Sequence, residues 1–136
     1  MYISAKVDYA VRALCGVAEA NDAPRTAEAL ARLQGLPPKF LESILNDLRR
    51  AGLLVSQRGA EGGYRLAKPA NEITVGDVLS FVEDGKKAKR PASDAFSGLW
   101  KRIDEAVSGV VDHTTFAEMA RAWKQSQAEY VANWDI

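Results

Sequence analysis

Apolar residues near the start of the chain recur with the spacing of an amphipathic α-helix. From Val7 onward they fall at i, i+3, i+4, i+7, i+8 and i+11, which predicts a helix over residues 5–21 with one apolar stripe. Ser4 precedes this helix as a capping residue. Residues 26–33 predict a second, shorter helix, which Gly35 ends in a left-handed conformation.

The next segment combines a third helical pattern with two strand patterns. The helix begins at Pro37-Pro38, because proline suits a first helical turn, and it carries apolar residues at Leu41, Ile44, Leu45 and Leu48. Residues 53–57 and 64–67 predict a hairpin around a glycine-rich turn. A lone hairpin is unstable in water, so it must pack on the helices. The order predicts a winged helix-turn-helix.

Two capping boxes mark later helices, Thr74-Val-Gly-Asp77 and Thr115-Phe-Ala-Glu118. Between them lies a polar loop, followed by a long amphipathic helix with one apolar side. We predict a mainly α fold with a two-stranded β-hairpin wing. Residues 1–83 form the DNA-binding domain, 84–98 the loop, and 99–136 an arm with a long dimerisation helix and a C-terminal helix. The dimerisation residues are Leu99, Trp100, Ile103, Val107 and Val110.

The composition is consistent with one such domain and its arm. The chain has 136 residues, 47% of them apolar, with 18 basic and 18 acidic residues. Residues 1–70 carry a net charge of +3 and residues 71–136 a net charge of −3, so positive charge favours the half with the wing. Charged residues interrupt the N-terminus, and no apolar run has membrane-spanning length, so we expect a cytoplasmic protein without a membrane partner.

The outward side of the third helix and the turn of the wing are the candidate DNA-binding surfaces. Asn can pair with adenine, Glu with cytosine, and Lys or Arg with guanine or phosphate. An arginine on a wing can enter a minor groove, and glycines let the backbone approach phosphates. A solvated helix face and an ordinary turn are the plainer interpretations. The candidates on these surfaces are Lys39, Phe40, Glu42, Ser43, Asn46, Arg49, Arg50, Arg58, Gly59, Gly62 and Gly63.

Several blocks resemble a known family of bacterial regulators. These are YAVRAL, LPPKFLESILNDLRRAGLLVSQRG, GGYRLAKPANEITVGDVL and a late LW. They are similar to the IscR/NsrR/CymR-type (Rrf-type) winged-helix family over residues 2–116. The resemblance implies a homodimeric transcription factor, usually a repressor, that binds a palindrome-like operator in double-stranded DNA. It also implies that Glu42 reads bases, that Arg58 enters the minor groove, and that Ser4 and Lys6 lie near the DNA backbone.

The chain departs from this family at the sensor. Many members hold an iron–sulfur cluster through three cysteines in the loop before the long helix, whereas residues 84–98 contain none. Asp8 matches a cluster-ligand position in some members but has no companions, so a solvent-facing residue is expected. Cys15 lies on the apolar stripe as a small hydrophobe, and His113 is expected in a turn. We therefore expect no cofactor and no metal.

Two further questions stay open in the sequence. The basic run 86–90 is either a solvated linker or, with the long helix, part of a pocket for an anionic small-molecule effector or a partner protein. No nucleophile–base pair or phosphate loop indicates an enzyme, and no catalytic residue is expected. The alternative function is a winged-helix protein-interaction module that regulates through a partner protein. Net neutrality and Glu61 in the wing turn favour that alternative slightly.

Overall fold

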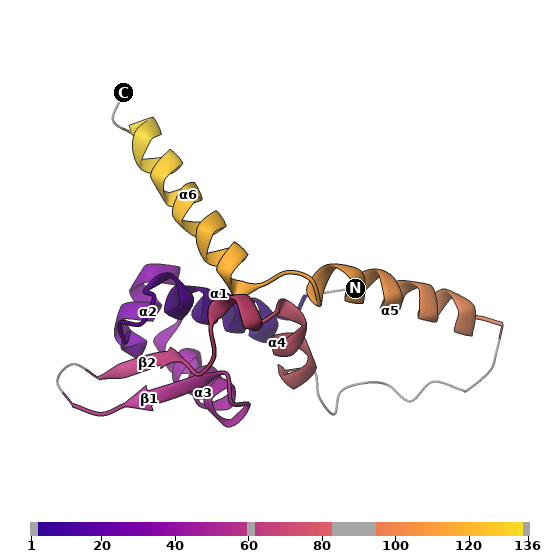
Figure 1. Ribbon diagram of the computed structural model, residues 1–136, viewed down its shortest axis with the longest axis horizontal. Helices are drawn as coiled ribbons and strands as arrows, with labels where there is room; N and C mark the ends of the chain where they lie inside the picture. The colour runs from indigo at the N-terminus through magenta and orange to yellow at the C-terminus, as the bar shows by residue number, and fades with distance from the viewer. Residues whose placement is uncertain (1–2, 60–61, 83–94, 135–136) are drawn as a thin grey trace.

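The computed structural model describes residues 3–59, 62–82 and 95–134. Helices dominate, and the described strands form one two-stranded antiparallel sheet, so the predicted fold class is confirmed. Figure 1 shows the elements in order: α1 (Ala5–Glu19), α2 (Ala27–Gln34), α3 (Pro38–Arg50), β1 (Leu54–Gln57), β2 (Gly63–Leu66), the short 3-10 helix η1 (Ala70–Glu72), α4 (Val75–Val82), α5 (Ser97–Val111) and α6 (Phe116–Trp134).

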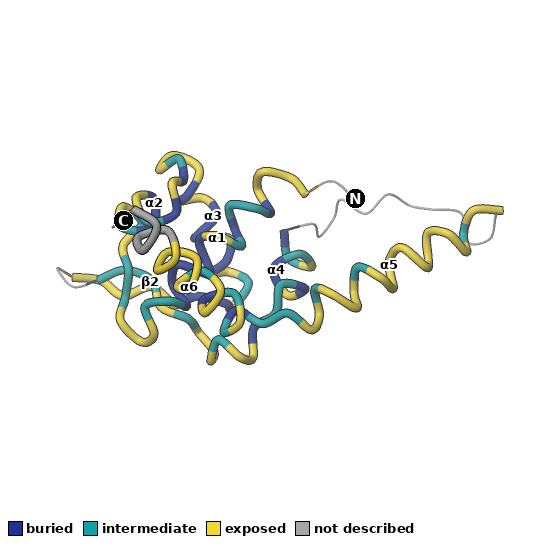
Figure 2. The backbone as a smooth tube through the Cα atoms, turned by 90° about the horizontal axis from the view of Figure 1, so that it is seen from above, coloured by how far each residue is buried: buried dark blue, intermediate teal, exposed yellow. Residues whose placement is uncertain are grey.

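Helix α1 is the centre of the hydrophobic core. Ser4 caps it, because the Ser4 hydroxyl accepts a hydrogen bond from the Val7 N–H at 3.2 Å. Its apolar stripe contacts α2, α3, α4 and α6, and Figure 2 shows the buried backbone gathered around it. At Gly16 the crossing with α2 is close: a Cβ there would lie 2.8 Å from the Leu30 Cδ2. Glycine therefore lets the first two helices approach each other.

The wing pairs β1 with β2 in the register Leu54↔Leu66 through Gln57↔Gly63. Its root is buried, since Leu53 and Leu54 belong to the core. A third backbone segment joins it at Arg25. The Arg25 N–H donates to the Tyr64 carbonyl at 3.1 Å, and the Tyr64 N–H donates to the Arg25 carbonyl at 2.7 Å. Besides the predicted pairing with β1, strand β2 thus forms a one-residue antiparallel bridge with Arg25.

Two backbone hydrogen bonds fix the connection between the winged domain and the last two helices. The Val75 N–H donates to the Thr114 carbonyl, and the Phe116 N–H donates to the Ile73 carbonyl, each at 2.9 Å. From this junction α5 extends away from the other elements (Figure 1), while α6 packs on α1. Phe116 is fully buried, so it links α6 to the core. The division into a domain over 1–83 and an arm over 99–136 stays a prediction.

Both predicted capping boxes lie at helix starts. At α4 the box is reciprocal: the Thr74 N–H donates to the Asp77 carboxylate at 3.0 Å, and the Asp77 N–H donates to the Thr74 hydroxyl at 3.2 Å. At α6 the Glu118 N–H donates to the Thr115 hydroxyl, also at 3.2 Å. These contacts satisfy backbone N–H groups that have no partner within a helix. His113 lies in the turn between α5 and α6, as expected.

Candidate nucleic-acid interface

The turn between α2 and α3 sets the angle of the candidate recognition helix. Thr26 caps α2, and Gly35 ends it in the left-handed conformation with φ of 65°. The Leu36 N–H donates to the Ala31 carbonyl at 2.9 Å, and the Leu36 side chain is buried. Pro38 then occupies the first turn of α3. These contacts hold α3 in a fixed orientation after a tight turn, as a helix-turn-helix requires.

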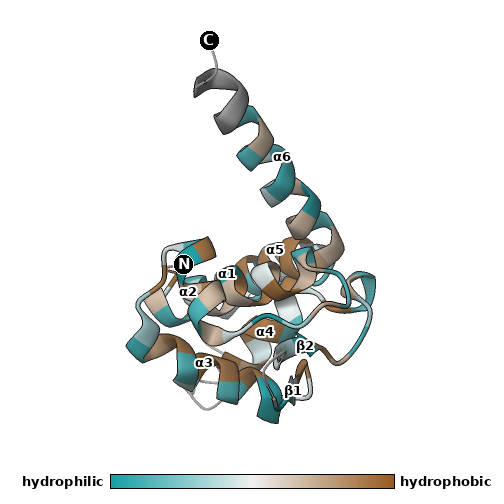
Figure 3. Cartoon of the chain, turned by 90° about the vertical axis from the view of Figure 1, so that its left-hand side faces the viewer, coloured by the Kyte–Doolittle hydropathy of each residue, from teal (hydrophilic) through white to brown (hydrophobic). Residues whose placement is uncertain are grey.

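Helix α3 separates its residues into a buried side and an outward side. Leu41, Ile44, Leu45 and Leu48 are all buried. Hydrophobic and hydrophilic positions alternate along α3 in Figure 3, in keeping with this division. The predicted outward residues Lys39, Phe40, Glu42, Ser43, Arg49 and Arg50 are exposed, and Asn46 is half-buried. Their contacts with DNA stay a prediction.

Two polar contacts organise the outward side of α3. The Arg49 Nη2 donates to the Asn46 Oδ1 at 2.6 Å, which aligns the two side chains along the helix. On another flank, the Lys6 Nζ lies 3.3 Å from the Asp47 Oδ2 and joins the start of α1 to α3. Ser4 and Lys6 therefore both lie at the end of α1 that contacts α3. Sequence reasoning missed Asp47, because its partner lies 41 positions away.

The wing turn places Arg58 in solvent next to Gly59, whose φ is 111°. Gly62 and Gly63 are needed because neighbouring backbone atoms leave no room for a side chain at either position. A Cβ at Gly62 would lie 2.3 Å from the Gln57 carbonyl oxygen, and one at Gly63 would lie 2.5 Å from the Arg25 carbonyl. Both glycines thus have a structural reason in the turn, and their approach to phosphates stays a prediction. The turn residue Glu61 lies outside the described residues.

Arg25 is a structural residue that sequence reasoning did not find. Its Nη1 donates to the Gly16 carbonyl oxygen at 2.8 Å and also contacts the Glu19 carboxylate. Because its backbone pairs with Tyr64, Arg25 ties the wing to the end of α1. The isolated bridge involves one residue on each side, which is too short for a periodic signal. The position of Arg25 between Pro24 and the α2 cap, where no helix is predicted, was the available hint.

The predicted dimerisation side of α5 is exposed in the single chain. Val110 is 65% exposed and Leu99 is 47% exposed, while Trp100 and Ile103 are near 40%. Val107 is half-buried. Figure 2 shows exposed positions along most of α5. An apolar side of this length is available for a partner helix, and pairing with a second copy stays a prediction.

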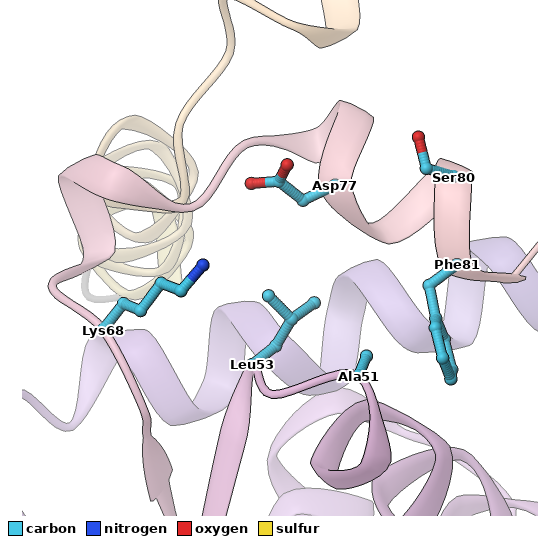
Figure 4. Close-up of a pocket in the computed structure, with 6 residues that line it drawn as sticks. All are labelled: Ala51, Leu53, Lys68, Asp77, Ser80 and Phe81. Carbon is cyan, nitrogen blue, oxygen red and sulfur yellow. The ribbon is translucent and has the colours of Figure 1, made fainter.

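A shallow pocket of about 310 Å³ lies between the end of α3, the root of the wing and α4. Figure 4 shows Lys68, Asp77 and Ser80 around it, with Ala51, Leu53 and Phe81 as apolar walls. The Asp77 carboxylate already caps α4. The pocket is open and presents mixed charge, so it does not by itself define a ligand. The predicted effector loop with the basic run 86–90 lies outside the described residues.

The donor set does not fit a cysteine-held iron–sulfur cluster. Cys15, the one cysteine in the sequence, is buried. Burial, and to a smaller extent the nearby Glu19 carboxylate, raises the pKa of its thiol to about 11. Cluster ligation requires accessible thiolates. Asp8 pairs with the Arg12 guanidinium at 3.0 Å. Within the residues that the structure describes, no three His, Cys, Asp or Glu side chains gather as metal ligands.

The fold and this interface define a winged helix-turn-helix DNA-binding transcriptional regulator. A family model described as Rrf2, iron-dependent transcriptional regulator, matches residues 3–122. The chain belongs to the Rrf2 family. This membership confirms the resemblance seen in the sequence blocks. Across the described ranges, no helix combines the length and apolar character needed to cross a membrane.

Curated relatives and solved structures agree with this assignment. A relative in Mycobacterium tuberculosis is 36% identical, covering 88% of this chain and 81% of that protein. The regulator CymR of Bacillus subtilis is 32% identical, covering 96% of this chain and 98% of its own. The solved structure of CymR, the global cysteine regulator of B. subtilis, covers 90% of this chain and 98% of its own, with a TM-score of 0.80 and 31% identity. T. potens IscR covers 93% of this chain and 91% of its own, with a TM-score of 0.81 and 30% identity.

Proposed function

We propose that this protein is a homodimeric repressor that binds a palindrome-like operator and carries no iron–sulfur cluster. The supporting observation is the outward side of α3, which exposes a mixed set of polar side chains, together with a wing whose Arg58 is also exposed. Mixed donors and acceptors suit base edges in a major groove, whereas a uniformly basic side would suit phosphates alone. The operator duplex is therefore the partner that this side fits.

In the proposed complex α3 lies in the major groove and Arg58 reaches the adjacent minor groove. Glu42 accepts a hydrogen bond from a base, and Ser4 and Lys6 lie near phosphates at the start of α1. The apolar side of α5 pairs with that of a second copy. A two-fold dimer presents two copies of α3 about one helical turn of DNA apart, which makes the operator palindromic.

Repression follows from occupancy in this proposal. A dimer that covers a promoter excludes RNA polymerase by steric overlap and needs no additional contact surface. This activity places the protein in the cytoplasm with its DNA. In vitro transcription from a promoter that carries the operator should fall as the protein is added. A rise in transcript would instead indicate an activator.

The absence of a cluster rests on the donor set described above. Protein purified under anaerobic conditions should be colourless and should contain no stoichiometric iron or sulfide. A visible absorption band with iron and sulfide in equal amounts would contradict this part of the proposal.

DNA binding is tested with duplexes selected from a random library by the full-length protein. Fluorescence anisotropy should then show a preferred, symmetric sequence. Arg58→Ala should weaken binding to it by about fivefold or more, since a groove contact contributes about 1–3 kcal/mol. Arg121→Ala removes the same charge from the exposed surface of α6 and serves as the control. Failure to prefer any duplex over random DNA would contradict the operator and favour a protein partner.

A further inference from the structure

Phe40 is an exposed aromatic residue on a helix side that is otherwise polar. Its side chain is 61% exposed, and it is not among the half-buried apolar residues that pack on the core. Its exposed neighbours on α3 are Lys39 and Ser43. Most other large exposed apolar residues in the described ranges lie on α5 or next to it, where one partner surface could cover them. Phe40 therefore needs a separate explanation.

The position of Phe40 within α3 indicates what it can contact. It is the third residue of the helix, and its N–H donates to the Pro37 carbonyl at 3.3 Å. The first residues of a recognition helix contact base edges. Helical spacing places Phe40 on the same flank as Asp47, two turns later, and Glu42 on the opposite flank. Phe40 and Glu42 therefore face different positions of a bound duplex.

The major groove offers one apolar group to a side chain in this position. Guanine, cytosine and adenine present only donors and acceptors there, whereas thymine also presents its 5-methyl group. A phenyl ring gains from losing contact with water, and it cannot satisfy a polar base edge. We propose that Phe40 is a specificity-determining residue that packs against the 5-methyl group of one thymine in each operator half-site. The inference rests on the proposed placement of α3 in the major groove.

Replacing thymine with deoxyuridine in the selected duplex tests this contact, because the change removes only the methyl group. Each thymine is replaced in turn, together with its symmetry mate. At one position the wild-type affinity should fall about three- to tenfold, as expected for loss of a buried methyl contact. Phe40→Ala should bind the thymine duplex with a similar loss and show no additional loss with deoxyuridine. Phe40→Leu keeps an apolar side chain and should keep part of the sensitivity.

The outcomes separate this inference from the proposed function. Phe40→Ala should melt near the wild-type temperature, because Phe40 lies outside the core. Suppose that a preferred duplex exists, but replacing any of its thymines with deoxyuridine changes the affinity of the wild-type protein and of Phe40→Ala equally. That result would overturn the thymine contact alone. Equal weakening of preferred and random duplexes by Phe40→Ala would also overturn it. Binding without any preferred duplex would overturn the operator itself.

Discussion

Asp47 places a negative charge on the side of the protein that is proposed to approach phosphates. The Lys6 ammonium lies 3.3 Å from its carboxylate, and both side chains remain partly exposed. Exposed ion pairs of this kind contribute at most about 1 kcal/mol to folding. The effect of this pair on DNA affinity is expected to be larger, because it neutralises a cation that could otherwise contact phosphate.

Asp47→Asn should therefore bind DNA of any sequence more tightly, since Lys6 gains access to a phosphate. The logarithm of affinity should fall more steeply with the logarithm of salt concentration, by up to about one in slope. Anisotropy titrations at several salt concentrations measure this slope. The double variant Lys6→Ala/Asp47→Asn should lose the increase. An unchanged slope in Asp47→Asn would show that Lys6 does not compete for phosphate.

Cys15 makes stability depend on pH at the alkaline end. Burial, together with the Glu19 carboxylate, raises its pKa from 9.0 to about 11, so the folded state keeps the thiol neutral. Below pH 9 the stability that comes from keeping this buried thiol neutral is fully present. It is lost as pH rises toward 11, because the unfolded thiol ionises first. The loss reaches up to about 3 kcal/mol, since each pKa unit of difference corresponds to about 1.4 kcal/mol.

Urea unfolding of wild-type protein and Cys15→Ala across this range checks the prediction. The advantage of the wild type in free energy of unfolding should shrink as the pH rises. Other ionising groups cancel in the comparison, because both proteins contain them. A constant difference between the two proteins would mean that the thiol ionises equally in the folded and unfolded states.

At the scale of elements, the junction between α4 and the α5–α6 turn is unusually close. A Cβ at Gly76 would lie 2.0 Å from the Asp112 Oδ1. Gly76→Ala should therefore destabilise the protein by about 1 kcal/mol or more, because the Asp112 side chain must move out of the way. Asp112→Ala in the same chain should restore most of that loss, while Asp112→Ala alone should have a small effect. Thermal melting of the three variants measures this coupling, and additive effects would argue against it.

The helices differ in how much of their position and packing could be predicted from the sequence. Helix α3 was predictable because its four core leucine and isoleucine positions follow one helical period. The helix starts at Thr74 and Thr115 followed from local capping chemistry. The packing of α6 on α1 through Phe116 could not be predicted, because an amphipathic pattern does not say which surface it covers. The same limit applies to Arg25, whose partners lie elsewhere in the chain.

The interface shows a similar division. The outward positions of α3 follow directly from the buried ones, so their exposure could be derived from spacing. The Lys6–Asp47 pair and the close approach of Gly63 to Arg25 depend on tertiary contacts. Such contacts join residues that carry no shared local pattern, and only the folded chain brings them together.

At the scale of the whole molecule, α5 is the element that should control assembly. Ile103 is 41% exposed in the centre of its apolar side. Ile103→Glu would place a charge in the proposed interface, so sedimentation should show a shift from dimer to monomer with the fold retained. Operator affinity should fall by at least about tenfold, because two half-sites are no longer bound together. Ser108→Glu adds the same charge away from this side and should remain dimeric.

The attachment of Arg25 to Tyr64 has a consequence for how the molecule opens. The wing is bonded to a residue that is itself held to the end of α1 by a carbonyl and a carboxylate. The wing root should therefore exchange its amide hydrogens together with the first helix, as a single cooperative unit. A wing root held in this way is already in position before DNA arrives. Binding would then not have to order the root, which keeps the entropic cost of contacting DNA small.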